Sequence, residues 1–185
     1  MYPILLQPID TETFNIADKV VKIPKCVVTF DKWLGEPIKE TFGGKPIVAV
    51  DNKPMFAELA IMTLFIKSGW NARWVETYGK GNQEPICLTE WKDDKYKNQI
   101  HKPIDNEAVN ETLHRISKIN SNTYAGCWDV VGWQSETILF AESKRNKKDS
   151  IRESQINWLS SGLKHGLSTN NFLMVQWDMR APDSN

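Results

Sequence analysis

The chain has 185 residues, 41% of them hydrophobic, which is enough for one domain with a core and too few for two comfortable ones. Its 23 basic and 23 acidic residues cancel, so bulk charge gives no argument for a nucleic-acid partner, and any basic surface must be a local patch. Three distant cysteines without a CxxC pair argue against a disulfide framework and a zinc site, and favour a reducing compartment.

No segment approaches the roughly 18 apolar residues of a membrane span. Residues 1–10 lack the basic start and long apolar stretch of a secretion signal. We therefore expect a cytoplasmic protein without membrane contact, folded as a single domain over residues 1–185. For each of the eight tryptophans, packing in the core or the sheet is the favoured interpretation.

Short strand-like runs at residues 26–30 and 38–42, separated by the turn at 34–37, predict a β extension over residues 1–50. The remaining residues, 51–185, are expected to form the main body of the fold.

The first helix is predicted to start near Asp51 or Asn52, with Pro54 in its first turn, and to continue from 55 to 66 until Gly69 stops it. A strand over residues 70–76 should follow.

An insertion at 77–120 is expected next. Residues 77–105 show no period and predict a long loop, whereas 106–120 have the spacing of an amphipathic helix.

Two largely apolar runs, 128–133 and 137–142, flank a polar turn and predict an antiparallel hairpin. A capping-box pattern from Ser150 to Glu153 predicts a helix that ends near His165 and Gly166, and a last strand covers 172–177. The order after residue 50 is helix, strand, inserted helix, strand, strand, helix, strand, which is an α/β fold.

Glu142 and Lys144 are two residues apart at the end of a predicted strand, so period-2 alternation puts both side chains on one face. Asp129 lies on the paired strand, within reach of Glu142. Two carboxylates on rigid neighbours suit Mg²⁺. Lys144 could then orient an attacking water or stabilise charge at phosphorus, which would be phosphodiester hydrolysis.

A simpler interpretation is also open. Asp129 could mark a strand entry, and Glu142 and Lys144 could form an exposed ion pair on a solvated strand end.

Residues around this triplet add basic and polar groups. Arg145, Lys147 and Lys148 form a basic turn that could neutralise phosphates, although a solvated loop looks the same. Arg152 and Gln155 are one helical turn apart and can project to one place, where Gln155 could contact water, Lys144 or a phosphate.

Glu58 is the only charged residue between Met55 and Ile66, and its helical neighbours are apolar. A carboxylate there is expected to be partly buried and to need a partner such as a metal, a lysine or a set of donors. The alternative is a Glu on the one solvent-facing strip of the helix.

Taken together, Asp129, the triplet Glu142-Ser143-Lys144, the run from Lys148 to Gln155 and the pair Trp158-Leu159 resemble the virus-type replication-repair nuclease (VRR-NUC) family of the PD-(D/E)xK superfamily. The resemblance covers residues 124–177, and the helix of Glu58 is similar to the family's first core helix.

The resemblance implies a restriction-endonuclease-like αβββαβ core, with a central mixed sheet flanked by helices, and Mg²⁺ or Mn²⁺ held by Asp129, Glu142 and the accessory acid Glu58. Lys144 would assist the water and Gln155 would complete the catalytic site. Nucleic acid, DNA in preference to RNA, would be bound by the basic side chains of Arg145, Lys147, Lys148 and Arg152.

Three functions remain as expectations from the sequence. The first is a metal-dependent nuclease, the second a non-catalytic nucleic-acid-binding module of the same fold in a replication, repair or phage complex, and the third a structural or interaction protein. A domain this small can need a second copy to grip both strands of a duplex, so a homodimer is a further expectation.

Two further patterns give weaker evidence of function. Gly43-Gly44-Lys45-Pro46 lacks the spacing of a phosphate-binding loop and is rejected as one. Aromatic and basic residues interleave between Trp91 and Lys102 and could stack on bases, but Asp93 and Asp94 offset their charge.

Overall fold

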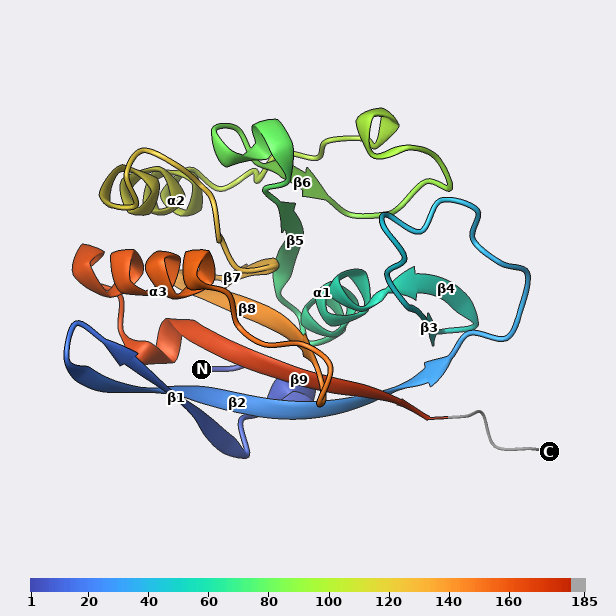
Figure 1. Cartoon of the computed structure of the whole chain (residues 1–185), viewed down its shortest axis with the longest axis horizontal. Helices are drawn as coiled ribbons and strands as arrows, with labels where there is room; N and C mark the ends of the chain where they lie inside the picture. Colours follow the sequence, from blue (N-terminus) through green and yellow to red (C-terminus); the bar gives the residue numbers. More distant parts are fainter. Residues whose placement is uncertain (181–185) are drawn as a thin grey trace.

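The computed structural model describes residues 1–180, apart from the side chain of Lys80, and residues 181–185 of the predicted single domain lie outside the described part (Figure 1). One mixed sheet runs through the described residues, in the order β4-β3-β2-β9-β8-β7-β5-β6, with β1 paired to β2. Its nine strands are β1 (Asp10–Ile16), β2 (Lys19–Lys32), β3 (Ile47–Val50), β4 (Lys53–Phe56), β5 (Asn71–Glu76), β6 (Ile86–Leu88), β7 (Val130–Gln134), β8 (Thr137–Arg145) and β9 (Phe172–Arg180).

Three α-helices flank the sheet and bury its two faces. Helix α1 (Ala57–Lys67) packs on one face, in a core cluster that includes Phe65 and Trp74. Helices α2 (Glu107–Ile119) and α3 (Glu153–His165) contact each other and cover the other face, in a second cluster around Trp128 and Trp158 (Figure 1). Six of the eight tryptophans are buried, as the sequence predicts; they are Trp70, Trp74, Trp128, Trp133, Trp158 and Trp177.

The elements that hold the predicted site residues follow the predicted order. Helix α1 leads into β5, which pairs antiparallel with β7; β7 pairs antiparallel with β8, and β8 pairs parallel with β9 after the crossover helix α3. A parallel pair needs such a crossover, whereas β7 and β8 need only the turn at Ser135 and Glu136. The insertion between β5 and β7 contains the predicted helix as α2, and also the short strand β6.

The predicted strand at 38–42 is wrong. Residues 33–46 form a loop, and the strand before it, β2, is longer than predicted. The alternation at 38–42 is real, but Phe42 has φ of 48° and directs its ring into an aromatic cluster with Trp74 and Trp91 instead of a strand face. Tertiary packing has overridden the local pattern.

The first helix also begins later than predicted. Asp51 and Asn52 both have positive φ and make the turn between β3 and β4, so they do not cap a helix, and Pro54 lies in β4. Helix α1 begins only at Ala57, and it ends, as predicted, before Gly69, whose φ is 79°. Asn and Asp tolerate the left-handed conformation, which fits a hairpin turn better than a cap.

Helix α3 begins at Glu153, so the capping box predicted from Ser150 to Glu153 is wrong. The Oε1 atom of Gln155 accepts a hydrogen bond of 2.8 Å from the backbone N–H of Arg152 instead. The amide of Gln155 therefore satisfies one of the backbone donors that a helix N-terminus leaves unpaired.

The cysteines Cys26, Cys87 and Cys127 are buried and free, as expected for a chain without a disulfide framework. Across residues 1–180, no helix combines the length and the apolar character that crossing a membrane requires.

Gly126 provides a test of the packing beside the start of α3. It has φ of 81°, and a Cβ atom there would overlap the carbonyl group of Ser154. We expect Gly126→Ala to lower the free energy of unfolding by about 2–5 kcal/mol, the sum of left-handed backbone strain and overpacking. Urea denaturation measures the change.

Gly166→Ala is the matched control, because Gly166 has φ of 110° but a Cβ atom at this position would meet no other atom within 4 Å. It should cost only the backbone term of about 1–2 kcal/mol. Equal losses in the two variants would contradict the close approach at Gly126.

Candidate active site

A cavity of about 1000 Å³ lies where β5, β8 and the first turns of α1 and α3 meet the loop 33–46. All five residues predicted to be catalytic line it, although they come from distant parts of the sequence: Glu58, Asp129, Glu142, Lys144 and Gln155. The fold thus brings together the residues that the sequence analysis selected.

Asp129 lies at the point where the β7–β8 ladder stops. The last pair of that ladder is Val130 with Ala141, so Asp129 is one residue beyond it. Its Oδ2 atom accepts a hydrogen bond of 2.9 Å from the backbone N–H of Ser143, and its backbone carbonyl accepts one of 2.8 Å from Val75. The carboxylate therefore takes the place of a ladder acceptor and is fixed between the two strands.

Glu142 and Lys144 share a face of β8, as alternation predicts. The Nζ atom of Lys144 lies 2.9 Å from Oε1 of Glu142. The Glu142 side chain is 1% exposed and that of Lys144 14% exposed. The alternative of an exposed ion pair on a solvated strand end is therefore wrong.

Gln155 joins this pair to helix α3. Its Nε2 atom donates to Oε1 of Glu142 at 2.5 Å, and its Oε1 atom accepts from Nζ of Lys144 at 3.1 Å as well as from Arg152 N–H. The ring of Trp128 adds a further link by donating from Nε1 to the Gln155 carbonyl at 3.2 Å. One amide side chain thus fixes the acid, the lysine and the start of the helix together.

The carboxyl group of Glu142 is short of donors. Oε2 of Glu142 is buried and has no hydrogen-bond partner within residues 1–180. Asp129 is the carboxyl group whose negative charge acts on Glu142, and it is itself an acceptor, from the backbone N–H of Ser143. Two ionised carboxylates cannot donate to each other, so the pair needs a shared proton or a cation.

The pKa values reflect this shortage. Burial, followed by the charge of Asp129, raises the pKa of Glu142 well above its usual value, and Lys144 opposes the shift. Burial, followed by the charge of Glu58, raises the pKa of Asp129, while Lys45 and the Ser143 N–H oppose it. Each group therefore binds a proton more readily in the folded chain than in the unfolded one.

A divalent cation could also compensate for the missing donors at Glu142. Within the described residues, no three His, Cys, Asp or Glu side chains are grouped to hold a metal ion. The three predicted ligands, Asp129, Glu142 and Glu58, are thus not grouped in this way. Asp129 and Glu142 would still suffice for Mg²⁺, which binds through one or two carboxylates and keeps waters and phosphate oxygens as its other ligands.

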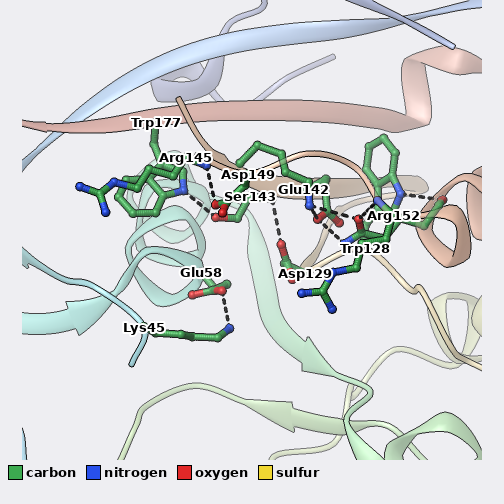
Figure 2. Close-up of polar contacts among 12 residues, drawn as sticks. Lys45, Glu58, Trp128, Asp129, Glu142, Ser143, Arg145, Asp149, Arg152 and Trp177 are labelled. Atoms are coloured by element: carbon green, nitrogen blue, oxygen red, sulfur yellow. Dashed lines mark hydrogen bonds and ion pairs between the residues drawn. The ribbon is translucent and has the colours of Figure 1, made fainter. Parts of the chain in front are cut away.

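Glu58 has found the lysine partner that was one of its three predicted options. It lies in the first turn of α1, is 9% exposed, and accepts from Nζ of Lys45 at 2.5 Å (Figure 2). Lys45 also lies over the ring of Trp74, 4.9 Å from its centroid. In Figure 2, Asp129 stands between this pair and Glu142, so Glu58 adds negative charge beside Asp129.

Lys45 and Glu76 are two charged residues of this cavity that were not predicted as site residues. Lys45 was considered only as part of a phosphate loop. Burial lowers its pKa, but the carboxylates of Glu58 and Asp129 outweigh that effect and raise it. Burial raises the pKa of Glu76, at the end of β5, and Lys45 opposes that shift. The alternation of β5 could have identified Glu76, since it follows Ala72 and Trp74 on one face.

The predicted basic residues divide between two cavities. Arg145, Lys148 and Arg152 line the main cavity, where the guanidinium of Arg145 lies over the ring of Trp177 at 5.7 Å. Lys147 lines a neighbouring cavity of about 380 Å³ instead. Three cationic side chains therefore border the candidate active site.

Comparison with protein-family models, with curated proteins and with solved structures finds no match to this chain.

Asp129→Asn tests the electrostatic cost of burying the carboxylate of Asp129 beside other acids. Because the folded-state pKa of Asp129 is raised, its contribution to stability is fully present below the unfolded pKa of about 4 and is lost as the pH rises through the folded value. At about pH 7.5 in EDTA, we expect the variant to be more stable by about 1 kcal/mol, or about 2–4 °C in Tm. The gain should shrink at about pH 4.5, which thermal unfolding at both pH values would show.

Glu136→Gln is the control, since Glu136 is exposed in the turn at the opposite end of β7 and β8. It should leave Tm unchanged at both pH values. A gain for Asp129→Asn that is the same at both pH values would contradict the electrostatic explanation.

Proposed function

We propose that the protein is a Mg²⁺- or Mn²⁺-dependent nuclease that hydrolyses phosphodiester bonds in DNA, with a restriction-endonuclease-like core of the VRR-NUC type. The observation that carries the proposal is the convergence of Asp129, Glu142 and Lys144, from two paired strands, on a cavity bordered by cationic side chains. The order α1, β5, β7, β8, α3, β9 supports it, because it is the αβββαβ order that the resemblance implies.

In this proposal Asp129 and Glu142 hold the cation. The shortage of donors at Glu142 supports the assignment, because a cation would satisfy the buried Oε2 atom that the described protein donors leave unpaired. When bound, such a cation supplies Lewis acidity at the phosphate and lowers the pKa of a water. Glu58 is the accessory acid, which adds charge beside Asp129 and holds Lys45 in the cavity wall.

Lys144 orients the attacking water. An ammonium group has three N–H donors, and the described contacts to Glu142 and Gln155 use two of them. The third can donate to the water or to a phosphate oxygen as charge develops there. Gln155 holds Lys144 and Glu142 in position relative to each other through its side-chain amide.

Hydrolysis forms one bond from the water oxygen to phosphorus and breaks the bond from phosphorus to the sugar oxygen. The attacking water releases one proton to the solvent, and the departing sugar oxygen takes up one proton from it. Arg145, Lys148 and Arg152 bind the flanking phosphates, as cations at the mouth of the cavity can do. Lys147, on the neighbouring cavity, can contact only a strand that continues past this site.

Cleavage assays with purified protein test the proposal. Labelled single-stranded, duplex, flapped and branched DNA are incubated with Mg²⁺, with Mn²⁺ or with EDTA. Wild type should cut at least one substrate in Mg²⁺ or Mn²⁺ and none in EDTA. Glu142→Ala and Lys144→Ala should each lower the rate by about 100-fold or more, the usual loss on removing a group that stabilises transition-state charge.

Lys118→Ala is the control, because Lys118 is an exposed lysine of α2 that does not line the cavity. It should cut like wild type. If wild type and both active-site variants are equally inert on every substrate, the nuclease is ruled out, and DNA binding that persists would then identify the non-catalytic module.

A further inference from the structure

The wall of the cavity opposite β8 is aromatic. Phe42, Tyr78 and Tyr96 all line it. The rings of Phe42 and Tyr96 are stacked, with centroids 4.9 Å apart and planes at 21°. Tyr78 contacts both of them edge to face, at 6.0 Å from each centroid. The three rings form one continuous cluster, here called the aromatic wall.

The aromatic wall has an open end. Tyr78 is 68% exposed, and it is the one aromatic residue among the large hydrophobic side chains that are exposed in the described part of the chain. The other such residues are aliphatic. An exposed ring on the border of a cavity, backed by two stacked rings, leaves a flat apolar surface in contact with water.

The chain holds the aromatic wall in place at a cost in local conformation. Phe42 has φ of 48°, a left-handed backbone that a bulky residue rarely adopts. The carboxylate of Glu76 accepts a hydrogen bond of 3.0 Å from the backbone N–H of Tyr78 and so fixes the turn that follows β5. Strained residues of this kind persist where the surrounding structure requires them, and they cluster at ligand sites.

Tyr96 also carries a polar group. Its hydroxyl is buried and has no hydrogen-bond partner among the groups that the structure describes. Because this oxygen is buried, Tyr96 contributes its ring, and not its hydroxyl, to the lining of the cavity.

The two walls offer complementary chemistry. Arg145, Lys148 and Arg152 lie on the side of β8 and the start of α3, and the aromatic wall comes from the loop 33–46 and the segments after β5 and β6. Cations bind phosphates, and aromatic rings stack on bases of any sequence. A nucleotide is the ligand that presents an anion at one end and a flat ring with polar edges at the other.

We propose that the aromatic wall is a stacking platform for an unpaired base, so that the substrate is single-stranded DNA or a single-stranded segment next to a duplex. A base inside a duplex has both faces covered by its neighbours and cannot stack on Tyr78, whereas an unpaired base can. This inference rests on the proposed function for the position of the phosphate, but it concerns binding and can be tested without cleavage.

Fluorescence anisotropy measures the binding of labelled DNA, and in EDTA no cutting is expected. The probes are a labelled oligothymidylate of about twelve nucleotides, within the site size of single-strand binders, and a duplex of the same length. Wild type should bind the single strand more tightly than the duplex. Tyr78→Ala should weaken single-strand binding by about 5- to 100-fold, the loss of one stacked base, and leave duplex binding unchanged. Tyr78→Phe should bind like wild type.

The salt dependence separates stacking from charge. Tyr78→Ala should leave the slope of log affinity against log salt unchanged. Lys148→Ala should make this slope shallower by about 1, the value expected for the loss of one phosphate contact. Ile4→Ala, which removes an exposed apolar side chain outside the cavity, is the control and should change neither.

The outcomes keep the two proposals distinct. If Tyr78→Ala binds the oligothymidylate as tightly as wild type, or if duplex and single strand bind equally, the platform is overturned, whether or not the protein cuts DNA. If the Tyr78 effect is found while no substrate is cut in any metal, the platform stands and the nuclease fails.

Discussion

Two buried carboxyl groups meet where the β7–β8 ladder ends, and neither can satisfy the other. Glu142 is fully buried, with one oxygen that no described donor reaches, and Asp129 lies one residue past the last strand pair. Burying such a pair costs free energy unless a proton or a cation compensates it. The surrounding groups limit that cost: Lys144 and Gln155 pair with Glu142, and the Ser143 N–H pairs with Asp129. A fold that keeps this arrangement has given up stability at the place where its proposed chemistry occurs.

Gln155 makes the position of α3 part of that compensation. The same amide closes the helix N-terminus on Arg152 and contacts both Glu142 and Lys144. A shift of the helix by one residue would break all of these contacts at once. This explains why the favourable capping pattern at Ser150 is not used: the contacts of the side chain at position 155 with β8 determine where the helix begins, and local capping propensity is the weaker term.

The sequence predicted the part of the site that depends on local geometry. Alternation alone puts Glu142 and Lys144 on one face, the two-residue turn pairs Asp129's strand with theirs, and the apolar neighbours of Glu58 indicate its burial. Of the aromatic wall, only Tyr96 lies in a run, Trp91 to Lys102, for which base stacking was considered. Lys45, Phe42 and Tyr78 were missed for a physical reason. They lie on the loop 33–46 and the insertion, where Phe42 leaves its strand-like pattern to join rings from other elements, and such long-range packing has no period in the sequence.

The loop 33–46 gives residues 1–50 a role beyond extending the sheet. Strand β2 pairs in parallel with β9 over seven residues, from Lys25–Met174 to Asp31–Arg180, and so covers the edge that the last strand of the αβββαβ segment would otherwise expose. From the end of β2 the chain crosses to the cavity, where Phe42 enters the aromatic wall and Lys45 contacts Glu58. The acids and Lys144 come from the αβββαβ segment, whereas part of the opposite wall comes from this loop. In the proposed function, chemistry and substrate choice are carried by different parts of the chain, and the loop that completes the cavity wall follows directly on β2.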